Sequence, residues 1–144
     1  KLNVTAASDK AKRLPILDPF TGEVLLDEDG EEMALWVVSH RSTRARNKRA
    51  EQIKELPPMP DGDDPEALKA WQVEAEAMGK RQLPELLAAL VTGIEGKWEY
   101  HGKPVTPGSD TLVDLIRNDP DEGNFIARPL EAMAANLGNY RPKM

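Results

Sequence analysis

The chain has 144 residues, which fits one domain and leaves little room for two large hydrophobic cores. It contains no cysteine, which excludes disulfides, thiolate metal sites and thiol redox chemistry. No stretch approaches the ~20 apolar residues that span a bilayer, and the N-terminus lacks the apolar core of a signal peptide, so we expect a soluble intracellular protein.

The formal net charge of -6 is unevenly distributed. Residues 41–54 hold six basic residues against one acid, a local charge of +5, which leaves -11 for the rest of the chain. A mostly acidic protein repels phosphates everywhere except at such a segment. The charge therefore argues against general nucleic-acid binding.

The N-terminal part reads as a flexible arm followed by β structure. Residues 1–13 are small, polar and basic without an apolar period. Three β-leaning runs follow at residues 14–17, 23–26 and 33–38, and glycine-containing turns separate them. Gly22 and Gly30 tolerate the positive φ that tight turns require. The pattern predicts a three-stranded antiparallel meander over residues 14–40.

Helical patterns begin at Ser42. Residues 42–56 predict a polar helix with a narrow buried stripe, and the prolines of residues 57–64 must end it. Asp64 then caps a second helix, which we expect Gly79 and Pro84 to interrupt. A third helix would begin at Pro84 and end near Gly93.

The C-terminal third predicts a short strand or extended link followed by two helices. Residues 98–100 form the link, and Ser109 can cap the next helix. Asp121 can cap the last one, in which Pro129 is a possible kink and Gly138 a stop. The fold class is therefore α+β, with a helical region over residues 41–140 that we expect to form one domain with residues 14–40.

The sequence offers no metal or cofactor site. His40 and His101 are far apart and have no metal-ligand spacing. The acidic run that ends at Gly30 lacks the spacing of a calcium loop, which favours a hairpin turn. The acidic group at residues 61–64 is explained by helix capping beside prolines.

Catalytic motifs are also missing. Gly93 and Gly96 lack the spacing and the lysine-serine end of a phosphate-binding loop, and no serine lies in a nucleophile elbow. Acid/base catalysis by carboxylates would need a placement that one sequence does not reveal. We therefore expect a protein that works by contact and not by catalysis.

The basic helix and the tryptophans are the candidate contact residues. The basic run lacks interleaved aromatics for base stacking, so a solvated helix face is favoured over an acidic protein partner, and both over nucleic acid. We expect Trp36 and Trp71 in the core, whereas Trp98 is equally suited to a core or an interface. The candidate partner-binding residues are Trp98, Tyr100, Arg41, Arg44, Arg46 and Arg49.

The order of several motifs resembles the tail assembly chaperone family of long-tailed bacteriophages. The motifs are Leu14-Pro-Ile-Leu-Asp-Pro-Phe-Thr-Gly-Glu-Val-Leu with Asp29-Gly, then Val37-Val-Ser-His-Arg-Ser-Thr-Arg, then Trp98 with Gly102-Lys-Pro-Val, and the ending Gly138-Asn-Tyr. The similarity touches most of residues 14–140. The resemblance implies a β-rich N-terminal part before helices, and no catalytic residues.

The resemblance also implies a role in the host cytoplasm. Proteins of that family are thought to keep the tape measure protein soluble and to help recruit tail tube subunits. We therefore expect the helices within residues 65–93 and 109–138 to contact tail proteins. Two alternatives are a structural minor tail or connector protein of the virion and a nucleic-acid-binding regulator that uses residues 41–54. The sequence does not indicate an oligomeric state.

Overall fold

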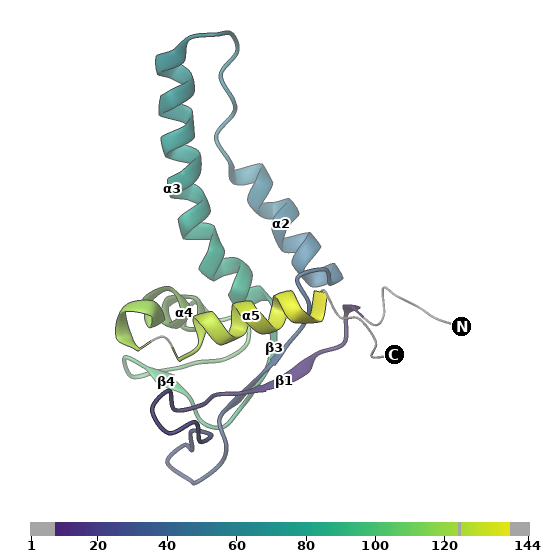
Figure 1. Ribbon diagram of the computed structural model, residues 1–144, viewed down its shortest axis with the longest axis vertical. Coiled ribbons are helices and arrows are strands. Elements are labelled where there is room, and N and C mark those ends of the chain that lie inside the picture. Colours follow the sequence, from purple (N-terminus) through teal and green to yellow (C-terminus); the bar gives the residue numbers. More distant parts are fainter. Residues whose placement is uncertain (1–7, 124, 139–144) are drawn as a thin grey trace, which may run out of the picture.

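The computed structural model describes residues 8–123 and 125–138 (Figure 1). The strands and helices follow one another along the chain as β1 (Lys12–Pro15), β2 (Ala34–Val37), α2 (Thr43–Glu55), α3 (Pro65–Ala89), β3 (Val91–Glu95), β4 (Glu99–Tyr100), β5 (Lys103–Pro104), α4 (Asp110–Glu122) and α5 (Ala127–Gly138).

The main sheet is antiparallel with the order β1-β2-β3. Leu14 lies opposite Leu35, and Leu35 lies opposite Ile94, so apolar side chains line one face of all three strands. The register shifts between Trp36 and Val37 in the pairing of β2 with β3. The predicted α+β class, with a three-stranded antiparallel sheet and N-terminal strands before the helices, is confirmed.

The third strand of the sheet is β3 and not the predicted run at residues 23–26. That run forms only isolated bridges, from Leu17 to Val24 and from Leu26 to Glu32. Leu25 donates its N–H to Ile16 and accepts one from Met33, at 2.8 and 2.9 Å. The run therefore fills the space between the extended ends of β1 and β2, where Leu25 packs against the core and Leu26 is exposed.

Part of the predicted N-terminal arm is attached to the fold. Residues 12–13 belong to β1, and the carboxylate of Asp9 accepts hydrogen bonds from the N–H and the hydroxyl of Thr43 at 2.6 and 2.9 Å. These bonds hold the pKa of Asp9 below its ordinary value. The start of α2 is thus fastened by Asp9 as well as by its N-cap, whereas residues 1–7 fall outside the described residues.

Helix α3 is one continuous element of 25 residues, so the predicted interruptions at Gly79 and Pro84 are wrong. Proline removes one N–H, but Pro84 is buried in the body of the protein, where its ring packs against other residues. Leu90 is the C-cap of α3, and the chain enters β3 at once. Gly93, the predicted helix stop, therefore lies within β3 opposite Trp36.

The last two helices meet at a cap that differs from the predicted one. Ser109 caps α4 as predicted, since its hydroxyl accepts the N–H of Leu112 at 3.1 Å. However, α4 continues through Asp121, so this residue cannot begin α5. Pro129 is the third residue of α5, where its missing N–H costs little, and no kink is required.

The hydrophobic core lies between the sheet and the helices. Helix α5 contacts β1 and β2, and it also contacts α3 and α4 (Figure 1). The largest side chains that are almost fully buried come from every layer: Ile16, Leu35, Leu90, Leu112, Ile116 and Leu130.

Candidate functional site: the helical arm and the candidate contact residues

Helix α2, the connecting residues 56–64 and the first part of α3 project away from the body as a hairpin (Figure 1). We call residues 43–82 the helical arm. Ser42 starts it as predicted, because its hydroxyl accepts the N–H of Ala45 at 3.1 Å. Asp64 restarts it by accepting the N–H of Glu66 at 3.1 Å, ahead of a proline in the first helical position.

The two helices of the arm are joined by polar contacts. The Gln52 side chain donates to the main-chain carbonyl of Gln82 at 2.7 Å, and the Gln82 side chain donates to the carbonyl of Gln52 at 2.9 Å. Further out, the indole N–H of Trp71 donates to the carbonyl of Pro57 at 2.8 Å. In α2 only Ala45 and Gln52 are buried, so the arm has almost no apolar core of its own.

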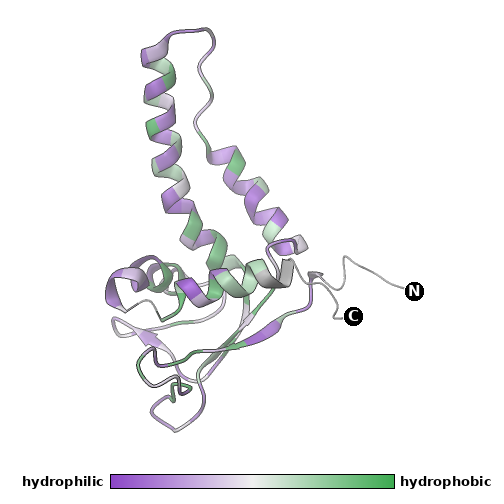
Figure 2. Cartoon of the chain, viewed as in Figure 1, coloured by the Kyte–Doolittle hydropathy of each residue, from purple (hydrophilic) through white to green (hydrophobic). Residues whose placement is uncertain are grey.

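Large apolar side chains are exposed along the arm. Ile53, Met59 and Val73 are 66%, 64% and 63% exposed, and Leu56 is exposed as well. Both helices of the arm show apolar segments between hydrophilic ones (Figure 2). An exposed apolar surface on an otherwise charged protein is typical of a contact site for another chain.

Two of the four candidate arginines fasten α2 to the body. Arg44 donates through Nε to the carbonyl of Ala89, and Arg49 donates through Nη1 to the carbonyl of His40 at 2.6 Å. Arg46 bonds the hydroxyl of Thr43 within its own helix, and Arg41 is an exposed residue directly before the cap. The basic segment thus anchors α2 to the body and also presents a charged surface.

Trp98 and Tyr100 differ in accessibility. Trp98 is only 7% exposed and donates its indole N–H to the carbonyl of Glu95 at 2.9 Å, so it belongs to the core. Tyr100 is half-buried; its hydroxyl donates to Glu122 at 2.7 Å and accepts from Asn118 at 3.1 Å. The bond to the Glu122 carboxylate raises the pKa of Tyr100. Of the two candidates, Tyr100 is therefore the one that a partner could reach.

The other two tryptophans were expected in the core, and the expectation for Trp36 is wrong. Trp36 is 37% exposed, lies across from Gly93, and donates to the carboxylate of Glu95 at 2.6 Å. It points away from the core because Leu35 and Val37, its neighbours on β2, occupy the buried face. Trp71 is half-buried beside Pro57 in the arm and does not belong to the hydrophobic core, so the expectation for it is wrong as well.

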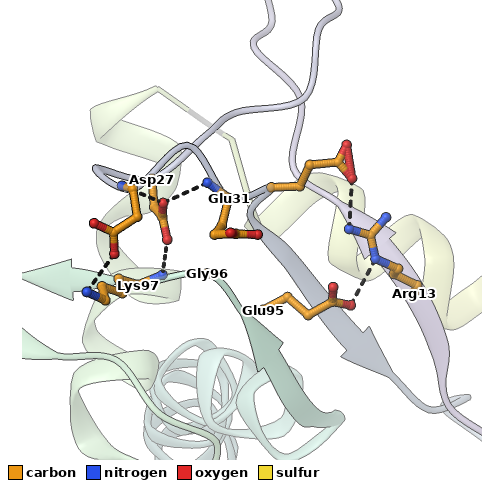
Figure 3. A pocket seen from close by; sticks show the side chains of 8 residues that line it. Arg13, Asp27, Glu31, Glu95, Gly96 and Lys97 are labelled. Carbon is orange, nitrogen blue, oxygen red and sulfur yellow. Dashed lines mark hydrogen bonds and ion pairs between the residues drawn. The ribbon is translucent and has the colours of Figure 1, made fainter.

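A charged hollow of about 470 Å³ lies at the end of the sheet, where the turn at residues 27–30 meets the end of β3 (Figure 3). Asp27 accepts the backbone N–H groups of Asp29, Glu31 and Lys97 at 2.9, 2.9 and 2.8 Å. The turn is thus built as the sequence predicts, and the contact with Lys97 ties it to the segment after β3.

The opposite side of this hollow is an ion-pair bridge. Arg13 on β1 donates to Glu95 at 2.9 Å and to Glu32 at 3.2 Å (Figure 3). The carboxylates of Asp27, Glu32 and Glu95 are thus paired with a cationic side chain or with backbone N–H groups. Within residues 8–123 and 125–138 no group of three or more histidine or acidic side chains could hold a metal ion.

The carboxylates of the hollow predict a loss of stability in acid. Hydrogen bonds from Arg13 hold the pKa of Glu95 below its ordinary 4.5, and the N–H groups around Asp27 hold its pKa below 3.8. A depressed native pKa stabilises the fold above the ordinary value, and this stabilisation is lost as the pH falls through the native pKa. We expect the urea midpoint to fall between pH 5 and pH 3, and to fall less in Glu95→Gln.

The control for this measurement is Glu28→Gln in the exposed part of the same turn. It should keep the full acid dependence of the wild-type protein. An identical pH profile for Glu95→Gln and the wild type would show that the Arg13–Glu95 pair does not contribute.

No protein-family model, curated protein or solved structure matches the chain. The family resemblance therefore rests on the motifs quoted above. Among the described residues, no helix combines the length and the apolar character needed to cross a bilayer.

Proposed function

We propose that this chain is a non-catalytic phage tail assembly chaperone that binds the tape measure protein, the tail tube protein or both during tail morphogenesis. The order of its motifs resembles that family. The observation that carries the proposal is the helical arm, which projects from the body and exposes large apolar side chains without a core to bury them.

The arm suits a helical client. An amphipathic helix of a client can lay its apolar face over exposed side chains of the arm such as Ile53 and Met59. Such contacts would cover apolar client surface that otherwise leads to aggregation. The acidic excess of the rest of the chain keeps the complex in solution.

The test is co-expression of the tagged chain with the tape measure and tail tube proteins of the same phage. We expect at least one of them to co-purify with the wild type. The double variant Ile53→Ser and Met59→Ser should reduce the retained client at least tenfold, because it removes exposed apolar surface without disturbing the core.

The matched control is Phe20→Ser, since Phe20 is 94% exposed but lies in a turn outside the arm. This variant should retain the client as the wild type does. Failure of both clients to co-purify with the wild type would overturn the proposal. Stoichiometric presence of the chain in purified virions, measured by mass spectrometry, would make it a structural tail protein instead.

A further inference from the structure

Charge is separated along the helical arm. Its tip, residues 61–76, carries six acids and one lysine, a net charge of -5. Its base, residues 43–54 along α2, carries five basic residues and one acid, a net charge of +4. We call these the acidic tip and the basic base. The acidic residues of the tip are Asp61, Asp63, Asp64, Glu66, Glu74 and Glu76, and the basic residues of the base are Arg44, Arg46, Lys48, Arg49 and Lys54.

The two charged regions of one arm lie at different levels along it. Arg44 donates to the carbonyl of Ala89 and Gln52 to that of Gln82, so the base lies beside the last part of α3, whereas the tip includes residues 65–76 of α3. At 1.5 Å per residue the centres of the two regions are offset by about 20 Å, which exceeds the Debye length of about 8 Å at physiological salt. The one ion pair between two described residues of the arm is Lys48–Glu51, which lies within the base.

The apolar side chains of the arm lie between and beside these charges. Ile53 lies near the end of the base, Leu56 and Met59 lie between the base and the tip, and Val73 lies within the tip. Exposed apolar side chains are thus interspersed with the charges of both regions and also occupy the connection between them.

We propose that two copies of this chain associate through their arms in antiparallel orientation, so that the acidic tip of each lies on the basic base of the other. The arrangement is a two-fold, self-complementary interface, in which the same contact is made twice. A parallel arrangement would place like charges together, which is unfavourable.

The arm is large enough for a small interface. Residues 65–82 of α3 span about 27 Å, and a hairpin of this length that is two helices, or about 20 Å, wide offers roughly 500 Å² per copy. Stable interfaces bury about 800 Å² per partner, so this pairing belongs to the small, weak class. The charge contacts make association sensitive to salt, and the exposed apolar side chains add contact area. The pairing does not depend on the proposed chaperone function, and because it would cover the same apolar side chains, a client would compete with it for the arm.

Sedimentation equilibrium and light scattering on the full chain test this proposal. The wild type is expected to be a dimer at micromolar concentration, with a dissociation constant that rises at least tenfold between 50 mM and 500 mM salt. A tip variant (Asp61→Lys, Asp63→Lys, Glu74→Lys) and a base variant (Arg46→Glu, Lys48→Glu, Lys54→Glu) should each be monomeric. Asp64, Arg44 and Arg49 are kept because they hold the cap and the base in place.

Mixing the two variants gives the sharpest result. The tip variant is basic at both ends and the base variant acidic at both ends, so an equimolar mixture should form a heterodimer although neither variant pairs with itself. The control (Glu23→Lys, Glu28→Lys, Glu31→Lys) changes the net charge by the same amount as the tip variant, but at exposed residues outside the arm, and should stay dimeric.

Cross-linking of single engineered cysteines gives a second measurement that leaves most of the charge unchanged. It is selective because the chain has no cysteine of its own. Asp63→Cys mixed with Lys48→Cys should form a disulfide-linked dimer, whereas each variant alone should not. A monomeric wild type at 100 μM, a dimer that persists in the tip and base variants, or a mixture that stays monomeric while circular dichroism shows folded chains would overturn the pairing. A monomeric result leaves the chaperone proposal standing, because client binding is measured separately.

Discussion

Replacing Asp119 by alanine is expected to lower the free energy of unfolding by about 3 kcal/mol, because its carboxylate organises the start of α5. Asp119 is only 3% exposed. It accepts the backbone N–H of Phe125 at 3.1 Å through one oxygen and those of Ile126 and Ala127 at 2.8 and 2.9 Å through the other. Alanine would leave these N–H groups without their acceptor, and each unsatisfied buried group costs about 1–3 kcal/mol.

The measurement is urea and thermal unfolding of the full chain. A loss of this size should lower the melting temperature by about 10 °C in a domain of this length. Asp119→Asn keeps one acceptor oxygen and should lose less. The matched control is Asp121→Ala, an exposed aspartate two residues further along α4, which should change the stability by less than about 0.5 kcal/mol. Equal losses at Asp119 and Asp121 would show that the cap does not stabilise α5.

The contrast between these two aspartates shows what local sequence can predict. The caps at Asp64 and Ser109 were predicted correctly because each accepts an N–H two or three residues ahead. Asp119 accepts from residues six to eight positions ahead, after α4 has ended. A pattern search for a residue directly before a helix therefore selects Asp121 and passes over the residue that the turn brings into place.

The third strand could not be predicted for a related reason. The sequence of β3 follows a leucine-rich helix without a break, and Gly93 reads as a helix stop when only neighbours in sequence are considered. The position of β3 is decided by its pairing with β2, which lies more than fifty residues earlier in the sequence. The β-branched Val91 and Thr92, next to Ile94, were the available signal for a strand.

The candidate site was predicted in its parts but not in its arrangement. The sequence identified the basic helix, the proline-rich break and the helix that Asp64 caps. It gave no sign that these form a projecting arm, because the two helices are joined by Gln52 and Gln82 and not by an apolar stripe. Trp36 and Trp98 show the same limit, since only the register of β2 and the fold around β4 decide which indole is buried.

Replacing Leu130 by alanine is expected to destabilise the body of the protein by about 3–4 kcal/mol, within the range found for fully buried leucines. Leu130 is 0% exposed and lies on α5, the helix that contacts β1, β2, α3 and α4. Truncation would leave a cavity where sheet and helices meet, and such closely packed interiors relax only partly. Leu83→Ala is the matched control, because Leu83 is 44% exposed on α3, and it should cost less than about 1 kcal/mol in urea unfolding. If the two leucines cost the same, burial of Leu130 between α5 and the other layers would add no more to the stability than the exposed Leu83 does.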